Sequence, residues 1–152
     1  MSIENPLNES LLSFPILECI HIVAFAFSVG TVAIVDFRLM GVCMKNQSPA
    51  DLWEDTWQWT LYGLIVVIVS GLLLFSSDPD NYYLNYAFLV KMVFLGVAIV
   101  YNYTAVRKAV AAPRSSGKSR TVGTVSLALW AMVAIGGIFI AAVVPGLNGN
   151  PL

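Results

Sequence analysis

Three ionisable side chains, Glu18, His21 and Lys91, interrupt long apolar stretches of the sequence. Charged groups at membrane depth cost about 2.5–3.5 kcal/mol each on insertion scales, so they usually face the protein interior and serve a function. A histidine beside a lysine could bind an anionic group, and a histidine could also be a ligand of haem or copper. We name these three residues the His21 cluster and expect it to bind a non-protein ligand or a partner subunit. The alternatives are that Lys91 pairs with Glu18, that Lys91 only anchors its helix by extending towards the headgroups, and that His21 only packs.

A second group of polar residues, Asp36, Arg38 and Asn102, is expected near the opposite membrane surface. Asp36 and Arg38 are two positions apart, so they cannot pair with each other along one helix face. We therefore expect both to meet partners on other helices. Together with Asn102 they form what we name the Asp36 cluster, which we interpret as a structural polar clamp.

The sequence contains no recognisable catalytic motif. A nucleophile–base pair, an HExxH motif, a phosphate-binding loop and a haem-attachment motif are all absent, so no catalytic residue is assigned and an enzymatic activity is not expected. Cys19 and His21 point in different directions on a helix and cannot chelate one ion together, which leaves His21 as the sole metal-ligand candidate. Cys19 and Cys43 lie about 36 Å apart along one helix, too far for a disulfide.

Membrane helices must position these residues. Of the 152 residues, 58% are hydrophobic and only 11% are charged, whereas a soluble domain has about 25% charged residues. This composition excludes a secreted disulfide scaffold and a disordered tail, and the net charge of −1 gives no attraction for nucleic acid. Because about 20 apolar residues cross a bilayer, the sequence predicts one all-α domain over residues 1–152, an integral membrane four-helix antiparallel bundle. The expected spans are residues 14–44, 56–77, 82–106 and 121–144.

The loop between the third and fourth spans is strongly basic, which fixes the expected orientation. Lys and Arg mark the cytoplasmic side of a membrane protein, so we expect both termini and the His21 cluster on the outer side. The Asp36 cluster then lies near the cytoplasm. Before the second span, Ser48 is expected to cap a helix whose first residue is Pro49. The basic residues of the loop are Arg107, Lys108, Arg114, Lys118 and Arg120.

Each expected span has one face of polar or small residues, which let membrane helices approach closely. We expect these faces to point inward, whereas Leu64 is expected to face lipid. The inward faces consist of Glu18, His21, Ser28 and Asp36; Thr56, Trp59, Gly63, Ser70 and Ser77; Lys91, Ala98, Asn102 and Ala105; and Gly123, Trp130, Gly137 and Ala141.

Several segments resemble a known family over nearly the whole chain. They include His21-Ile-Val-Ala-Phe-Ala-Phe-Ser-Val-Gly30 and Asp36-Phe-Arg38-Leu-Met-Gly41. The chain resembles an uncharacterised bacterial family of small four-helix inner-membrane proteins and is distantly similar to the membrane part of copper-resistance D-type proteins. The resemblance implies the fold and a place in the bacterial inner membrane, but no activity. In that membrane the basic loop on the cytoplasmic side would place both termini in the periplasm. Members often have a second His at the end of the third span, where this chain has Asn102-Tyr-Thr-Ala, and Gly-Arg in the fourth span, where this chain has Gly136-Gly137. Both departures weaken a ligand role.

Three functions remain open. The one we favour is a small membrane subunit that packs with, anchors or stabilises a larger complex of other subunits or copies of itself, because the loops are short and the helix faces are rich in small residues. The second is a redox protein that binds haem or copper through His21, although a bis-histidine haem needs two histidines. The third is a small transporter in which Lys91 and His21 gate an anionic solute. In each case the lipid bilayer surrounds the helices.

Overall fold

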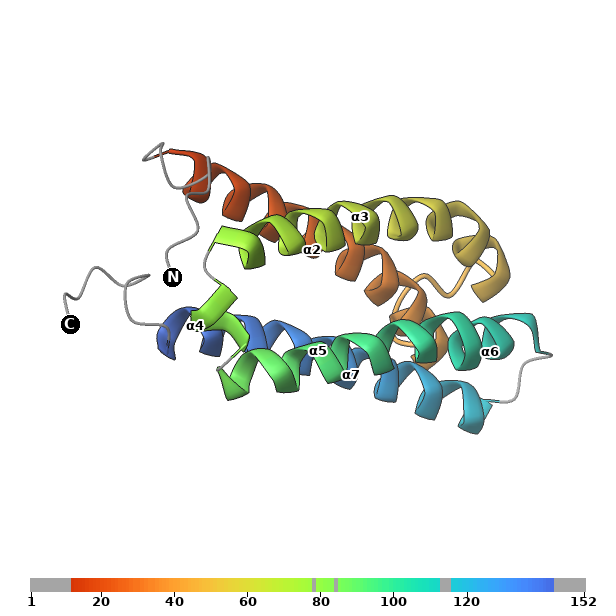
Figure 1. Ribbon diagram of the computed structural model, residues 1–152. Coiled ribbons are helices and arrows are strands. Elements are labelled where there is room, and N and C mark those ends of the chain that lie inside the picture. Colours follow the sequence, from red (N-terminus) through yellow and green to blue (C-terminus); the bar gives the residue numbers. More distant parts are fainter. Residues whose placement is uncertain (1–11, 78, 84, 113–115, 144–152) are drawn as a thin grey trace.

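The computed structural model describes residues 12–77, 79–83, 85–112 and 116–143, and every regular element within them is a helix (Figure 1). Four helical stretches are long and apolar enough to cross a membrane. The predicted all-helical character is therefore confirmed for the described residues, and the four apolar helices are consistent with a multi-pass membrane protein. The elements are α2 (Ser13–Met40), α3 (Pro49–Ser77), α4 (Pro79–Tyr83), α5 (Tyr86–Tyr101), the π-helix η1 (Asn102–Val106), α6 (Arg107–Ala111) and α7 (Ser116–Val143).

Local signals in the sequence explain where α2 ends and α3 begins. α2 stops at Met40, four residues before its expected end, because Gly41 has φ 77° and terminates the helix in the left-handed conformation. α3 begins at Pro49, as predicted. The backbone N–H of Asp51 donates to the hydroxyl oxygen of Ser48 over 3.0 Å, which confirms Ser48 as the capping residue.

The third span contains a π-helical segment. The third span begins after Asn85, whose side-chain oxygen accepts a hydrogen bond from the backbone N–H of Ala87 at 2.9 Å. Helix α5 continues through η1 into α6, so the span covers Tyr86–Ala111 rather than residues 82–106. A π-helix widens the turn and occurs most often at functional sites. This one begins at Asn102 of the Asp36 cluster.

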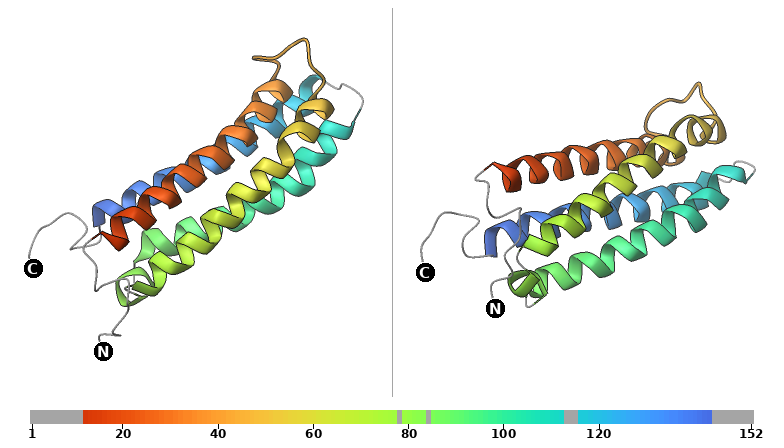
Figure 2. Two further views of the ribbon diagram at one scale, coloured as in Figure 1. Left: turned by 90° about the horizontal axis from the view of Figure 1, so that it is seen from above. Right: turned by 45° about the horizontal axis from the view of Figure 1, so that its top comes forward.

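The four long helices lie side by side, and each begins at the end of the molecule where the preceding one finishes (Figures 1 and 2). α2 packs against α3 and α7, and α5 packs against α7. The α2–α3 loop, α6 and the beginning of α7 share one end, which we call the loop end. α4 lies at the opposite end, which we call the α4 end.

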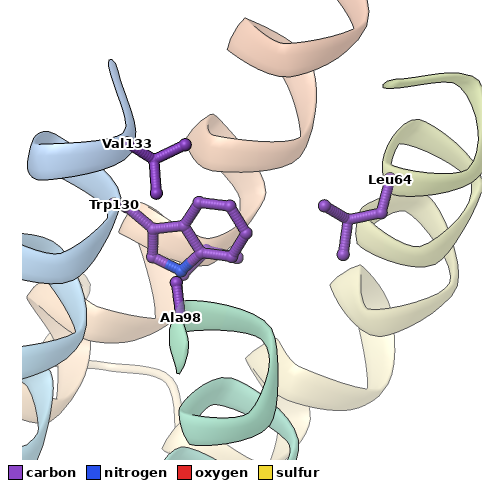
Figure 3. Close-up of a cluster of buried hydrophobic side chains, with 5 residues drawn as sticks. Leu64, Ala98, Trp130 and Val133 are labelled. Carbon is purple, nitrogen blue, oxygen red and sulfur yellow. The ribbon is translucent and has the colours of Figure 1, made fainter. Parts of the chain in front are cut away.

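Two hydrophobic clusters fill the space between the helices. In the first, Leu64 from α3, Ala98 from α5 and Trp130 from α7 converge (Figure 3). The second lies closer to the loop end. The first cluster consists of Val32, Leu64, Ala98, Trp130 and Val133, and the second of Val35, Leu39, Leu52, Val106 and Val110.

The predicted faces are largely inward, but two assignments on α3 are wrong. Leu64 is only 3% exposed. It follows Gly63, where α2 and α3 approach closely, and this close approach places Leu64 in the core. Trp59 is 57% exposed and packs edge-on against Phe27 at the outer margin of the α2–α3 interface. The large indole does not fit where the small Thr60 is buried. The predicted inward residues that are buried are Ser28, Asp36, Gly63, Ser70, Ala98, Asn102, Gly123 and Trp130.

Candidate functional site

His21 of α2 forms a hydrogen bond to α3. Its Nδ1 atom lies 2.9 Å from the hydroxyl oxygen of Ser70. The Ser70 hydroxyl donates its own proton to the carbonyl oxygen of Val66 at 2.6 Å. The Ser70 oxygen therefore accepts and Nδ1 donates. This assignment of the proton follows from the heavy-atom geometry. In the neutral imidazole, Nε2 then carries the free lone pair.

Glycines of neighbouring helices make room for His21 and Lys91. A Cβ atom at Gly71 of α3 would lie 3.1 Å from Cε1 of His21, and a Cβ at Gly136 of α7 would lie 3.1 Å from Cβ of Lys91. A Cβ at Gly137 would lie 3.6 Å from the Lys91 Nζ. Both ionisable side chains thus lie directly against a neighbouring backbone, and all four long helices contribute to this end of the interior.

Lys91 is half-buried and has no carboxylate partner among the described residues. Its ammonium group is close enough to act electrostatically on the His21 ring. Glu18 is also half-buried, but within the described part of the chain it forms no ion pair with either residue. The structure therefore brings His21 and Lys91 together, whereas Glu18 does not neutralise the lysine.

Arg38 of the Asp36 cluster binds the loop that follows its own helix. Its Nε donates to the carbonyl oxygen of Gln47 at 2.5 Å, and Nη2 donates to the carbonyl oxygen of Lys45 at 3.4 Å. The side chain is only 5% exposed. Arg38 therefore fastens the α2–α3 loop to the end of α2, and its partners are loop carbonyls rather than side chains of other helices.

Asp36 and Asn102 are buried without hydrogen-bond partners. Asp36 is fully buried and Asn102 is 2% exposed. Both carboxylate oxygens and the Asn102 amide oxygen lack a partner among the described residues. The Ser126 hydroxyl approaches the carboxylate from α7, but the two groups do not have the geometry of a hydrogen bond. Such groups are uncommon in proteins and require an explanation.

The sequence did not single out Thr31 and Thr60, whose hydroxyl groups line the interior beside that of Ser28. Thr31 and Thr60 form a hydrogen bond across the α2–α3 interface, with their hydroxyl oxygens 2.7 Å apart. Ser28 donates to the carbonyl oxygen of Thr60 at 3.3 Å. The helical spacing of Thr56 and Thr60 was the available signal, because residues four apart share a face.

No group of three or more His, Cys, Asp or Glu side chains that could hold a metal ion is present in the described ranges. Cys19 and Cys43 are both free thiols. The prediction that these two cysteines do not form a disulfide is confirmed.

The chain belongs to DUF6644, a family of unknown function that it matches over residues 14–144. This match confirms the resemblance to an uncharacterised family in its general form. No curated protein and no solved structure matches the chain.

Proposed function

We propose that the chain is a small integral membrane subunit that packs with, anchors or stabilises a larger complex, and that its His21 cluster binds an anionic group. That group belongs to a partner subunit, another copy of the chain or a non-protein ligand. The observation that carries the proposal is the Lys91 ammonium group, which lies between helices without a carboxylate partner in the described structure. An intramembrane charge of this kind marks a functional site by default.

The surroundings of Lys91 support binding rather than anchoring alone. The side chain packs on Gly136 and Gly137, and His21 packs on Gly71. Small residues at three positions bring two ionisable groups to one level of the interior. A hydrogen bond from Nδ1 of His21 to the Ser70 hydroxyl oxygen also fixes the orientation of the imidazole. A carboxylate or phosphate placed between the two side chains would form an ion pair with Lys91. It would also accept a hydrogen bond from a protonated His21.

The proposed setting is an antiparallel four-helix bundle in a bacterial inner membrane. The basic residues near the loop end support a cytoplasmic loop end, and both termini and the His21 cluster would then face the periplasm. The Asp36 cluster, with Asp36, Arg38 and Asn102, would hold the cytoplasmic end of the bundle together. The contacts of Arg38 with the α2–α3 loop support that role.

A paired substitution tests the site. His21→Ala and Lys91→Met should leave the folded helical bundle intact, apart from the loss of the His21–Ser70 hydrogen bond in His21→Ala, but should lose the bound partner or ligand. Native mass spectrometry of protein extracted from its own membranes measures the occupancy. The matched controls are Ile22→Ala and Lys108→Met, which remove an exposed apolar side chain and an exposed charge from the same helical stretches. If both site variants retain every partner and ligand at wild-type occupancy, Lys91 is only an anchor and His21 only packs.

Binding of haem or copper through His21 is a second proposal, supported by one observation. Metal-ligating histidines usually donate their other ring N–H to a protein group, and His21 donates from Nδ1 to Ser70. Nε2 would then be the ligand atom. Absorption in the Soret region and copper analysis of the purified protein test this proposal, and His21→Ala should remove either signal.

A further inference from the structure

A layer of buried polar side chains separates the two hydrophobic clusters. On α2, Asp36 lies between Val32 of the first cluster and Leu39 of the second. In the third span, Asn102 lies one turn from Ala98 and one turn from Val106.

The remaining two helices repeat this order. On α7, Ser126 lies between Trp130 of the first cluster and Val122, which packs against the second. On α3, the buried Thr60 lies one turn from Leu64 of the first cluster. All four long helical stretches therefore place a polar residue at this level. We name Asp36, Thr60, Asn102 and Ser126 the polar layer.

Most polar atoms around Asp36 lack a partner. Neither carboxylate oxygen of Asp36, nor the Asn102 amide oxygen, nor the Ser126 hydroxyl has a hydrogen bond in the described structure. The hydroxyl of Tyr103 and Nε1 of Trp130, which flank the layer, are likewise buried and unpartnered. Because burying such groups without partners is unfavourable, their concentration at one level indicates that the layer holds something else.

The layer also lacks a positive charge. Arg38, two residues from Asp36, uses Nε and Nη2 for the loop carbonyls of Gln47 and Lys45. No Lys, Arg or His among the described residues forms an ion pair with Asp36. Tyr101 on α5 is a titratable group within electrostatic range of the carboxylate, but it cannot supply positive charge. A buried carboxylate in this position needs a cation from solution or must take up a proton.

We propose that Asp36, Asn102 and Ser126 bind a monovalent cation, either Na⁺ or a proton. Carboxylate, amide and hydroxyl oxygens are ligands for hard cations and not for soft ones. A single positive charge neutralises the one carboxylate of the layer, whereas a divalent ion would leave an excess charge in the core. A bound Na⁺ would give partners to the oxygens of all three residues and join α2, η1 and α7, whereas a bound proton would make Asp36 a carboxylic acid that donates one hydrogen bond. The proposal does not depend on the function proposed for the His21 cluster.

Two further features lie at Asn102. Asn102 is the first residue of the π-helix η1, and π-helical turns are frequent at functional sites. A cavity of about 10 Å³ lies between α2, α3 and η1, with Thr31, Thr60, Asn102 and Tyr103 in its lining. It has room for about one water molecule, which would lie beside Asn102; Asp36 and Ser126 are not in the lining of this cavity.

Labelling with dicyclohexylcarbodiimide tests the proposal on the wild-type protein in lipid vesicles. The reagent modifies protonated carboxyl groups in apolar surroundings, and peptide mass spectrometry identifies the modified residue. We expect Asp36 to be labelled in Na⁺-free buffer. If the cation is a proton, the labelling rate should fall about tenfold for each pH unit above the titration midpoint, with no effect of Na⁺. If the cation is Na⁺, a concentration ten times the dissociation constant should lower the rate about tenfold at constant pH, whereas choline should have no effect.

Matched variants locate the cation. Ser126→Ala and Asn102→Leu should weaken protection by Na⁺ or shift the pH midpoint. Thr124→Ala and Thr104→Ala, which remove exposed hydroxyls from the same two segments, should change neither. Infrared spectroscopy of the Asp36 carboxyl group, identified by its loss in Asp36→Asn, provides a second measurement that does not require the reagent to reach the site. A carboxyl band that does not respond to Na⁺ and that titrates over the same pH range as a water-exposed aspartate would overturn the proposal and leave a layer filled by water alone.

Discussion

Replacing Gly63 by alanine tests the close contact between α2 and α3 that positions the groups described above. A Cβ atom at this position would overlap with the hydroxyl oxygen of Ser28 and lie 3.3 Å from Cβ of Ser28 and 3.4 Å from the carbonyl oxygen of Ala24. The two backbones must therefore separate or Ser28 must rotate. Rotation breaks the hydrogen bond from Ser28 to the carbonyl oxygen of Thr60.

The expected magnitude follows from three contributions. Overpacking a well-filled interface costs about 1–3 kcal/mol, and loss of the Ser28 hydrogen bond costs about 1 kcal/mol. Alanine gains about 1 kcal/mol over glycine in helix propensity. The net destabilisation is then about 1–3 kcal/mol. The matched control is Gly96→Ala on α5, where a Cβ would meet nothing within 4 Å, so that this variant should be neutral or slightly more stable.

Reversible unfolding in mixed detergent micelles measures both variants. A double-mutant cycle with Ser28→Ala should recover part of the loss, because removing the hydroxyl oxygen removes the most severe overlap. The separation of the helices should also weaken the His21–Ser70 hydrogen bond, which lies about two turns further along the same interface. If Gly63→Ala is as stable as Gly96→Ala, the close approach of α2 and α3 is wrong, and the positions of His21 and Thr60 derived from it are wrong as well.

Three further predictions concern individual contacts and orientation. Arg38→Gln should lower the free energy of unfolding by about 1.5–3 kcal/mol, since a charged donor to the Gln47 carbonyl is lost, and faster proteolysis of the α2–α3 loop should accompany that loss. Ser70→Ala should cost about 1 kcal/mol and release the His21 ring from one tautomer, which nitrogen NMR of the imidazole reports; an unchanged spectrum would contradict the assigned donor. Lys118→Cys, in a chain without its own cysteines, should react with an impermeant thiol reagent only after cells are opened. Reaction in intact cells would reverse the proposed orientation.

The helices and their inward faces could be predicted from the sequence because they depend on local patterns. Long apolar stretches define the four helical spans, and residues three or four positions apart share one face of a helix. That rule correctly predicts that Asp36, Ser70, Asn102 and Trp130 are buried. The start of α3 at Pro49 follows equally locally from a capping serine and a proline.

The errors arise where two helices determine the outcome together. Leu64 is buried because α2 approaches at the adjacent glycine, and no pattern within α3 alone shows how near α2 comes. The π-helix at Asn102 also has no distinctive residue pattern, so the sequence did not predict it. The partners of Arg38 depend on how the chain turns after Gly41, whose left-handed conformation brings the loop back over α2.

The two polar clusters carry opposite unbalanced charges at two levels of the same helices. Lys91 provides an ammonium group without a carboxylate partner among the described residues, and Asp36 provides a buried carboxylate without a cation. His21 and Asp36 are fifteen positions apart on α2, which corresponds to about 22 Å along the helix. The first hydrophobic cluster lies between these levels. The two charges therefore cannot form an ion pair with each other, and each must be balanced at its own level. An anionic partner or ligand at Lys91 and a monovalent cation at Asp36 satisfy this requirement independently, so that loss of one should leave binding of the other intact.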